Sequence, residues 1–347
     1  MTTKILMARI GLLVFCLLVA IGCLYTVGET SDPLARYTQD LSEGQKHLIL
    51  QYLSDDDIDY MIDSQLKPDD FMKFIKIDGF NIKNAKLYTT ALATQKASKT
   101  EIVNFVNKYR SHFTKNSLKN YLTYYSYTDL INFYETEQVL NPQLNLMENP
   151  ENPYLILSSN GSIYKYAPQD LVEFKDIQVR TAMVEDLETM MADYKSTLNQ
   201  SMKFLNGYKT YESLVDDFRI VDEAGPYVHK ILHQAGSNEE QLGYTIVLIG
   251  QDEWLASCIE HLNEEKTKVD YDAVFDSLSP KLQDAISWIE DNAYHYGFVV
   301  RYTQEGESQT QLWYQPFLLR YVGQKKAKEM HNANTIMENT TFTKELK

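Results

Sequence analysis

The chain has 347 residues, of which 44% are hydrophobic, enough for one large domain or two modest domains with buried cores. Its formal net charge is −15 at pH 7. Such an acidic surface is repelled by phosphate backbones, which argues against nucleic acid as a partner. Anionic lipid headgroups and anionic cell-wall polymers would repel it too, so any contact with a cell wall must be local.

The N-terminal segment predicts the cellular location. Lys4 and Arg9 precede an uncharged, apolar-rich run over residues 10–27, which is just long enough to span a bilayer. Basic residues before such a run keep the N-terminus inside and place the rest of the chain outside. We therefore predict that residues 1–28 form a membrane anchor or a lipoprotein signal. The protein would then lie on the extracytoplasmic face of a bacterial cell membrane.

The cysteines bear on both the anchor and the compartment. AIGC, at residues 20–23, resembles a lipoprotein cleavage box in which Cys23 would become the lipidated N-terminus; a single-pass anchor is the other alternative. Cys258 is the only cysteine after Cys23, so the outer part of the chain has no internal disulfide. An extracytoplasmic protein without disulfides is more typical of a bacterial envelope than of a eukaryotic secretory route.

Composition and periodicity divide the rest of the chain. Residues 29–45 are polar and contain Gly and Pro, which predicts a linker. Apolar residues at three- and four-residue spacing predict a helical region over residues 46–140. After a boundary rich in Pro and Asn, strands mix with helices without a βαβ rhythm. This predicts an α+β domain over residues 150–332, with a small antiparallel sheet flanked by helices. Residues 333–347 are predicted to be a polar tail.

Several segments of the α+β region have a distinct local pattern. YLILSSNG, which starts at Tyr154, and YTIVLIG, which starts at Tyr244, are typical of strands. Residues 179–198 predict a single amphipathic helix. Residues 282–297, LQDAISWIEDNAYHYG, predict a helix that Gly297 closes at its C-terminal cap.

Four sequence blocks follow one another in the α+β region: NGYKTYESL, AGSNEEQLGYTIVLI, WIEDNAYHYGFVVRY and YQPFLLRYVG. In this order and spacing they resemble the VanY-type zinc D-alanyl-D-alanine carboxypeptidases, a family of LAS metallopeptidases. The resemblance covers residues 154–330 and is densest in the third and fourth blocks. It implies a carboxypeptidase-like fold and a role in the bacterial cell wall, with peptidoglycan stem peptides as substrates.

The resemblance also implies a zinc site, and this sequence departs from it at each reacting position. The family's three ligands, His, Asp and a later His, fall at Glu240, Val247 and Leu318, and its general base, a Glu, falls at Gln315. Hydrocarbon side chains cannot ligate zinc, and an amide does not accept a proton near neutral pH. We therefore predict a pseudoenzyme with no intact catalytic residue or metal ligand and with no cofactor. We also expect Val247 and Leu318 to pack together as an apolar plug.

The resemblance implies a cleft in which an arginine holds the terminal carboxylate of the substrate peptide. That arginine is Lys209 here, which keeps the charge but loses the bidentate fork. Unaltered recognition of D-Ala-D-Ala is therefore not expected. The candidate ligand-binding residues of the cleft are Tyr208, Lys209, Glu240, Tyr314, Gln315 and Arg320.

The leading hypothesis is a membrane-tethered, extracytoplasmic protein whose carboxypeptidase-like domain has lost zinc and catalysis. It would bind a peptidoglycan stem peptide or regulate a cell-wall protein. A second hypothesis is an active metallocarboxypeptidase that trims stem peptides through displaced ligands such as His229 and His233, which form an HxxxH pattern. A third is a structural spacer of the envelope.

Overall fold

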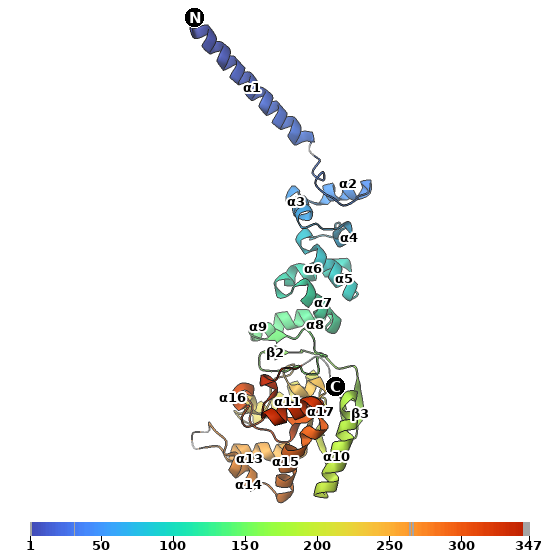
Figure 1. The fold of residues 1–347 in the computed structure, drawn as a ribbon, viewed down its shortest axis with the longest axis vertical. Helices are drawn as coiled ribbons and strands as arrows, with labels where there is room; N and C mark the ends of the chain where they lie inside the picture. The colour runs from blue at the N-terminus through green and yellow to red at the C-terminus, as the bar shows by residue number, and fades with distance from the viewer. Residues whose placement is uncertain (1, 31, 264, 266, 343–347) are drawn as a thin grey trace. The chain divides into compact units, whose positions relative to one another are not determined.

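The structure is a computed structural model, and it describes residues 2–30, 32–263, 265 and 267–342. The chain divides into two compact units, Met1–Leu122 and Thr123–Lys347. The first unit is helical, and the second contains both strands and helices (Figure 1).

The unit boundary lies upstream of the boundary near residues 141–154 that the sequence suggests. Contacts of side chains after residue 122 explain the difference. The Tyr125 hydroxyl donates to the carbonyl O of Met147 (2.8 Å), and the Phe133 ring packs edge-on against the Tyr164 ring. The last predicted helices of the helical region therefore belong to the second unit; they are α8 (Tyr127–Asn132), η3 (Phe133–Glu137) and α9 (Gln138–Leu140).

Helix α1 (Thr2–Thr30) contains the predicted membrane segment. Its large apolar side chains from Ile10 to Ile21 are exposed, as is Cys23. The last residues of the predicted run, 24–27, have side chains that lie outside what the structure describes. Within the described residues, none of the helices combines the length and hydropathy needed to cross a membrane. The membrane segment therefore has no support from the structure and stays a prediction.

The rest of the first unit consists of short helices, as the three- and four-residue spacing predicts. Its main helices are α2 (Glu43–Tyr52), α3 (Asp55–Asp63), α4 (Pro68–Phe71), α5 (Ala85–Thr94), α6 (Lys99–Tyr109) and α7 (Lys115–Tyr124), the last of which crosses the unit boundary. Ser42, Ser54 and Ser98 begin three of them through capping boxes, in which the serine side chain and the third helical residue satisfy each other's backbone donors. Met61 and Phe71 are fully buried in the core of this unit.

A four-stranded antiparallel sheet lies at the centre of the second unit. Its order is β5 (Phe204–Asn206), β6 (Thr245–Leu248), β8 (Leu318–Tyr321) and β7 (Phe298–Val300). All residues of β6 and β8 are buried; β6 is apolar after Thr245, whereas β8 also buries Arg320. This confirms the predicted α+β class with a small antiparallel sheet.

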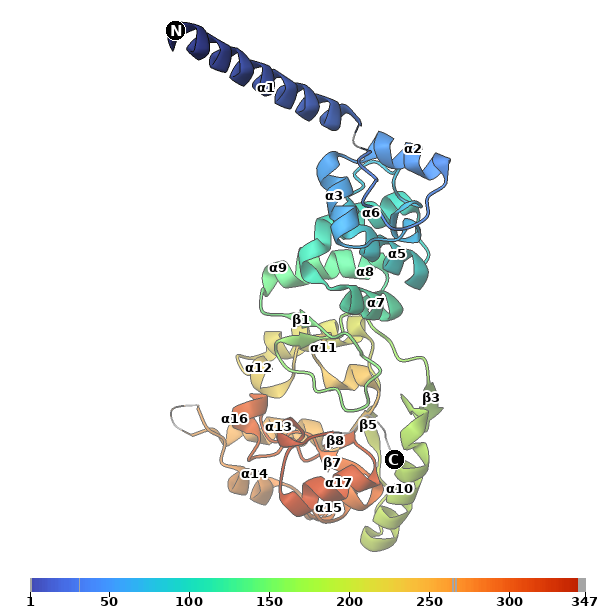
Figure 2. The same ribbon diagram turned by 45° about the horizontal axis from the view of Figure 1, so that its top comes forward.

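Helices surround this sheet, and two further strand pairs lie outside it (Figure 2). The helices are α10 (Val184–Leu198), α11 (Tyr211–Ala224), α12 (Val228–Ile231), α13 (Gln251–Glu260), α14 (Tyr271–Ser277), α15 (Pro280–Asn292), α16 (Glu307–Thr310) and α17 (Gln324–Ala333). The pairs are β1 (Asn145–Leu146) with β2 (Gly161–Ser162), and β3 (Leu171–Phe174) with β4 (Ile177–Arg180). Both α15 and α17 pack against β7.

Gly297 ends the predicted helix in the expected way. After α15 the chain continues as η6 (Ala293–Tyr296), and Gly297 then adopts φ +85°. A Cβ atom there would lie 2.9 Å from both the carbonyl carbon of Gly323 and the backbone N of Gln324, so only glycine fits.

Three local predictions differ from the structure. Residues 154–158 form no strand; there, the backbone N–H of Leu157 donates to the Glu239 carboxylate (3.3 Å). The single helix predicted over residues 179–198 begins only at α10, because its first residues pair in β4. The predicted polar tail is packed as far as residue 342: Met337 is 1% exposed and the Phe342 ring stacks on Tyr154. The rest of the tail lies outside the described residues.

Candidate functional site

Four positions that the resemblance assigns to zinc chemistry meet at one cavity. This cavity, which we call the site pocket, has a volume of about 210 Å³ and lies between α11, α12, η5 (Glu239–Leu242), β6 and β8. The four positions are Glu240, Val247, Gln315 and Leu318, and Lys209 also lines the pocket. The fold therefore brings together residues that the sequence blocks scatter over three separate segments.

Hydrocarbon forms the floor of the site pocket. Val247 on β6 and Leu318 on β8 are directly paired across the two antiparallel strands. They form one apolar cluster with Tyr302 and Leu312, and Val247 is only 3% exposed. Side chains opposite each other in such a pair are in van der Waals reach. The predicted apolar plug is thus confirmed, although a cavity remains beside it.

The side-chain amide of Gln315 makes two hydrogen bonds, and its backbone N–H makes a third. Its Nε2 donates to the carbonyl O of Ile231 (2.7 Å), and its Oε1 accepts from Nε2 of Gln251 (2.9 Å). Its backbone N–H donates to the carbonyl O of Tyr302 (2.9 Å). A carboxylate at residue 315 would have no proton to give to Ile231, so these surroundings match an amide and not a base.

Glu240 is the one predicted ligand position whose side chain carries oxygen atoms. Its backbone N–H donates to Oδ1 of Asn238, which caps η5 (2.8 Å). Its Oε2 is buried and has no hydrogen-bond partner among the described residues. Burial raises the pKa of Glu240 to about 7; the charge of Lys209 opposes this rise, and the charge of Asp217 adds to it.

Lys209 reaches the site pocket but is already paired. Its Nζ forms an ion pair with Oδ2 of Asp217 on α11 (2.6 Å). Its backbone N–H donates to the carbonyl O of Glu240 (3.4 Å), which holds the two segments side by side. A ligand carboxylate would therefore have to compete with Asp217 for this cation.

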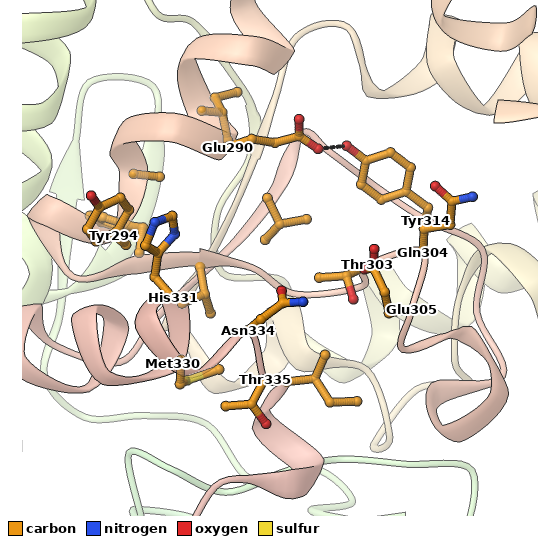
Figure 3. A pocket seen from close by; sticks show the side chains of 16 residues that line it. Glu290, Tyr294, Thr303, Gln304, Glu305, Tyr314, Met330, His331, Asn334 and Thr335 are labelled. Carbon is orange, nitrogen blue, oxygen red and sulfur yellow. Dashed lines mark hydrogen bonds between the residues drawn. The ribbon is translucent and has the colours of Figure 1, made fainter. Parts of the chain in front are cut away.

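The other three candidate binding residues do not line the site pocket. Tyr208 is fixed through its backbone to Gln178 (2.7 Å). The Tyr314 hydroxyl points away and donates to Glu290, at a separate cavity of about 330 Å³ (Figure 3). Arg320 is fully buried and pairs with Glu239, at 2.6 Å between its Nη1 and Oε2 of the carboxylate.

Arg320 belongs to a buried ion-pair network behind η5. Glu239, which is 1% exposed, also pairs with Arg301 through its Oε1 and the arginine Nε (3.0 Å). Arg301 in turn pairs with Glu338 (2.8 Å). The two arginines hold the pKa of Glu239 below its usual range against the effect of burial. This network positions the turn that carries Glu240.

The HxxxH pair does not form a helical metal site. Helix α12 ends at Ile231 and the backbone of Leu232 is extended, so His229 and His233 do not share a helix face. The His229 ring packs against Phe218, and His233 is buried in the site pocket, where desolvation lowers its pKa to about 4. In the described part of the chain, no group of three or more His, Cys, Asp or Glu side chains could hold a metal ion.

The site residues therefore do not fit catalytic zinc, which needs three N/O/S ligands and one open position. Only Glu240 among the predicted ligand positions has an atom that could ligate a metal ion, and Val247 and Leu318 present only carbon. Sequence reasoning missed Gln251, which directs its amide at Gln315. The signal for it was weak, because a glutamine at the start of a helix has no particular spacing to a motif.

Comparisons with known proteins agree with the resemblance seen in the sequence blocks. Residues 176–324 match the family model described as VanY, D-alanyl-D-alanine carboxypeptidase. Over these residues the chain is similar to the VanY-type carboxypeptidases. One relative is YodJ of Bacillus subtilis (strain 168), which is named as a carboxypeptidase. It is 26% identical over 208 residues, which are 56% of this chain and 69% of YodJ. A D-alanyl-D-alanine carboxypeptidase of Enterococcus faecium is 39% identical over 51 residues, which are 15% of this chain and 17% of that protein.

Solved structures also align with about half of the chain. The LdcB LD-carboxypeptidase has a TM-score of 0.42 and 24% identity, with coverage of 56% of this chain and 88% of LdcB. VanYB in complex with D-alanine-D-alanine has a TM-score of 0.40 and 14% identity, and the alignment covers 54% of this chain and 95% of VanYB. A variant of the vancomycin-resistance D,D-pentapeptidase VanY was solved in complex with Zn(II). It has a TM-score of 0.39 and 14% identity, and the alignment covers 54% of this chain and 97% of that protein.

Proposed function

We propose that this VanY-type domain binds a cell-wall peptide or a cell-wall protein without cleaving it. The observation that carries the proposal is the pairing of Val247 with Leu318 across β6 and β8, at the floor of the site pocket. In a metallopeptidase these positions would present a metal-bound water to the peptide bond. Here they present hydrocarbon.

The missing base supports the same conclusion independently. A metal-activated water must lose a proton to a nearby acceptor during hydrolysis. Gln315 cannot take it, and its hydrogen bonds to Ile231 and Gln251 hold it in an amide-specific arrangement. A single lost ligand would be compatible with residual activity, but loss of ligands and base together leaves no route to the family's reaction. The pocket nevertheless persists, which supports binding.

An extracytoplasmic location is part of the proposal. Residues 176–324 match a D-alanyl-D-alanine carboxypeptidase family model, and the cell-wall peptides that such enzymes trim lie outside the membrane. Helix α1 exposes large apolar side chains such as Leu13 and Phe15, and an exposed apolar surface of this size calls for a partner. We propose that it tethers the protein, either as a single-pass anchor or, after cleavage, through a lipid on Cys23.

A peptidase assay tests the proposal. The purified full chain is incubated with a pentapeptide that ends in D-Ala-D-Ala, with added Zn(II), and released D-alanine is measured. The expected result is no release above a protein-free control, while a VanY enzyme run in parallel releases D-alanine. Release that is abolished by a chelator and by His233→Ala would instead favour an active enzyme with displaced ligands. Full cell-wall function of a strain that lacks residues 150–347 would favour a structural spacer.

A further inference from the structure

Two residues that line the site pocket each carry a buried oxygen atom that accepts no hydrogen bond from any described residue. These atoms are Oε2 of Glu240 and Oε1 of Gln251. Gln251 is only 4% exposed, so its amide oxygen has little access to bulk water. Buried polar atoms in folded proteins nearly always have a partner. The pocket is therefore complete only when something supplies hydrogen-bond donors.

A relay of two amides fixes the polarity of this end of the pocket. The carbonyl O of Ile231 can only accept, so Gln315 must turn its Nε2 toward it (2.7 Å). The Oε1 of Gln315 then requires a donor, which is Nε2 of Gln251 (2.9 Å). The outer end of the relay is consequently Oε1 of Gln251, an acceptor. If the O and N atoms of the Gln251 amide were exchanged, its oxygen would face Oε1 of Gln315, and two acceptors would meet without a proton between them. The hydrogen bonds therefore fix the orientation of the Gln251 amide.

The charges around the site pocket also favour a ligand that donates hydrogen bonds. Among the described residues, Lys209 is the only Lys or Arg that lines it, and Asp217 already pairs with that side chain (2.6 Å). Glu240 and Asp252 also line the pocket. The pocket therefore offers unpaired acceptors and no unpaired cation, which disfavours a ligand carboxylate and favours a cationic donor.

Size and lining restrict the ligand further. A cavity of about 210 Å³ is smaller than small-molecule sites, which are about 300–1,000 Å³, so it admits one side chain or a group of similar size. Its floor is the apolar pair Val247 and Leu318. Leu205 and Ile220 line the pocket as well and are partly exposed, at 39% and 57%. A fitting group has an aliphatic stem and ends in hydrogen-bond donors.

We propose that the site pocket binds a primary ammonium group on a short aliphatic stem, as on the lysine side chain of a short peptide. The ammonium would donate to Oε1 of Gln251 and to Glu240, because it carries three donors and no acceptor. Its stem would lie along Val247 and Leu318. This assignment rests on the proposed function, since it requires that no metal occupies the pocket. It gives the pocket a cationic ligand where the family resemblance implies a carboxylate.

The test compares three probes by calorimetric titration into the purified full chain. They are Nα-acetyl-lysine methylamide, its Nε-acetyl form, and N-acetyl-D-alanyl-D-alanine. The first should bind saturably, and the other two at least about tenfold more weakly, because each lacks the charged donor. Equal binding of the first two probes, or preferential binding of the D-alanyl probe, would overturn the proposal.

Two variants locate the binding. Gln251→Leu and Glu240→Gln should each weaken the lysine probe at least about tenfold. Glu260→Gln, a carboxylate-to-amide change at an exposed position of α13 outside the pocket, should leave its affinity unchanged. Glu240→Gln preserves shape and removes a buried charge, so weaker binding by that variant is not a result of unfolding; a melting curve of each variant confirms this. Unaltered affinity in both pocket variants would contradict the assignment.

The outcome separates this inference from the proposed function. If the lysine probe fails to bind while the D-alanine release assay stays negative, only the ammonium assignment is wrong, and water satisfies the two oxygens. If the assay releases D-alanine, the proposed function itself is wrong, whatever the probes do.

Discussion

The replacement Gln315→Glu puts the family's general base back into the site pocket, and the structure predicts that the pocket rejects it at neutral pH. Gln315 is 2% exposed and its Nε2 donates to the carbonyl O of Ile231 (2.7 Å). A carboxylate cannot make this bond. Its second oxygen would face the carbonyl oxygen, so an acceptor is left unsatisfied and two partial negative charges oppose each other.

The expected cost follows from these contacts. A buried acceptor without a donor costs about 1–3 kcal/mol, and the repulsion adds to this, so we expect the variant to lose about 2–4 kcal/mol of unfolding free energy at pH 8. A protonated carboxyl can instead donate its O–H to Ile231. The folded state should therefore raise the pKa of Glu at residue 315 above the ordinary value of about 4.3. The folded state then binds more protons than the unfolded state, and the stability of the variant falls as pH rises from about 4.3 through that folded pKa.

Urea unfolding at pH 5 and pH 8, for the variant and the wild type, measures this difference. Gln309→Glu, an identical change at an exposed position on α16, is the control and should show little loss at either pH. If Gln315→Glu is no less stable at pH 8 than at pH 5, relative to wild type, the reasoning is refuted. The amide would then not be oriented toward Ile231, and the site would still accept a base.

Further predictions concern stability and are checked by urea unfolding. Glu240→Gln should be more stable than wild type by about 1–3 kcal/mol at pH 8 and equal to it at pH 4. The reason is that burial raises the folded-state pKa of Glu240 to about 7, so the stability of the wild type falls as pH rises from about 4.5 to 7. A stability difference that does not change over this range would contradict the burial of Glu240. Arg320→Met should cost about 3–5 kcal/mol, since Glu239 keeps only one of its two arginines, whereas Arg219→Met in an exposed ion pair should have no measurable effect. Gly297→Ala should cost about 1–3 kcal/mol through its positive φ and its contact with Gly323; a neutral result would mean that this turn relaxes.

The convergence of the four degenerate positions was predictable from sequence because the blocks preserve their order and spacing. The apolar run of β6 indicates a buried strand, and β8 is buried as well although it carries Arg320. Once they pair as neighbours, Val247 and Leu318 come to lie opposite each other. The helix that Gly297 closes was predictable for a similarly local reason, since its C-terminal signal lies within the segment itself.

Other features depend on contacts between distant segments, which periodicity does not encode. The segment after Tyr154 has strand-like composition, but the backbone N–H of Leu157 donates to the Glu239 carboxylate and not to a neighbouring strand. Tyr314 and Arg320 flank Gln315 in the same block, yet they point to Glu290 and Glu239 and not into the site pocket. A block match specifies which residues lie near a site, and only the packing determines which of their side chains face it.

Calorimetric titration of Zn(II) into the purified full chain at pH 7.5 tests the central claim most directly. The account predicts no saturable binding at the site pocket, because Glu240 is the only predicted ligand position with a donor atom. The quadruple variant Glu240→His, Val247→Asp, Gln315→Glu and Leu318→His supplies the family's residues, and binding by that variant alone would support the assignment of the positions. Stoichiometric zinc binding by the wild type that is lost in Glu240→Ala would contradict the claim.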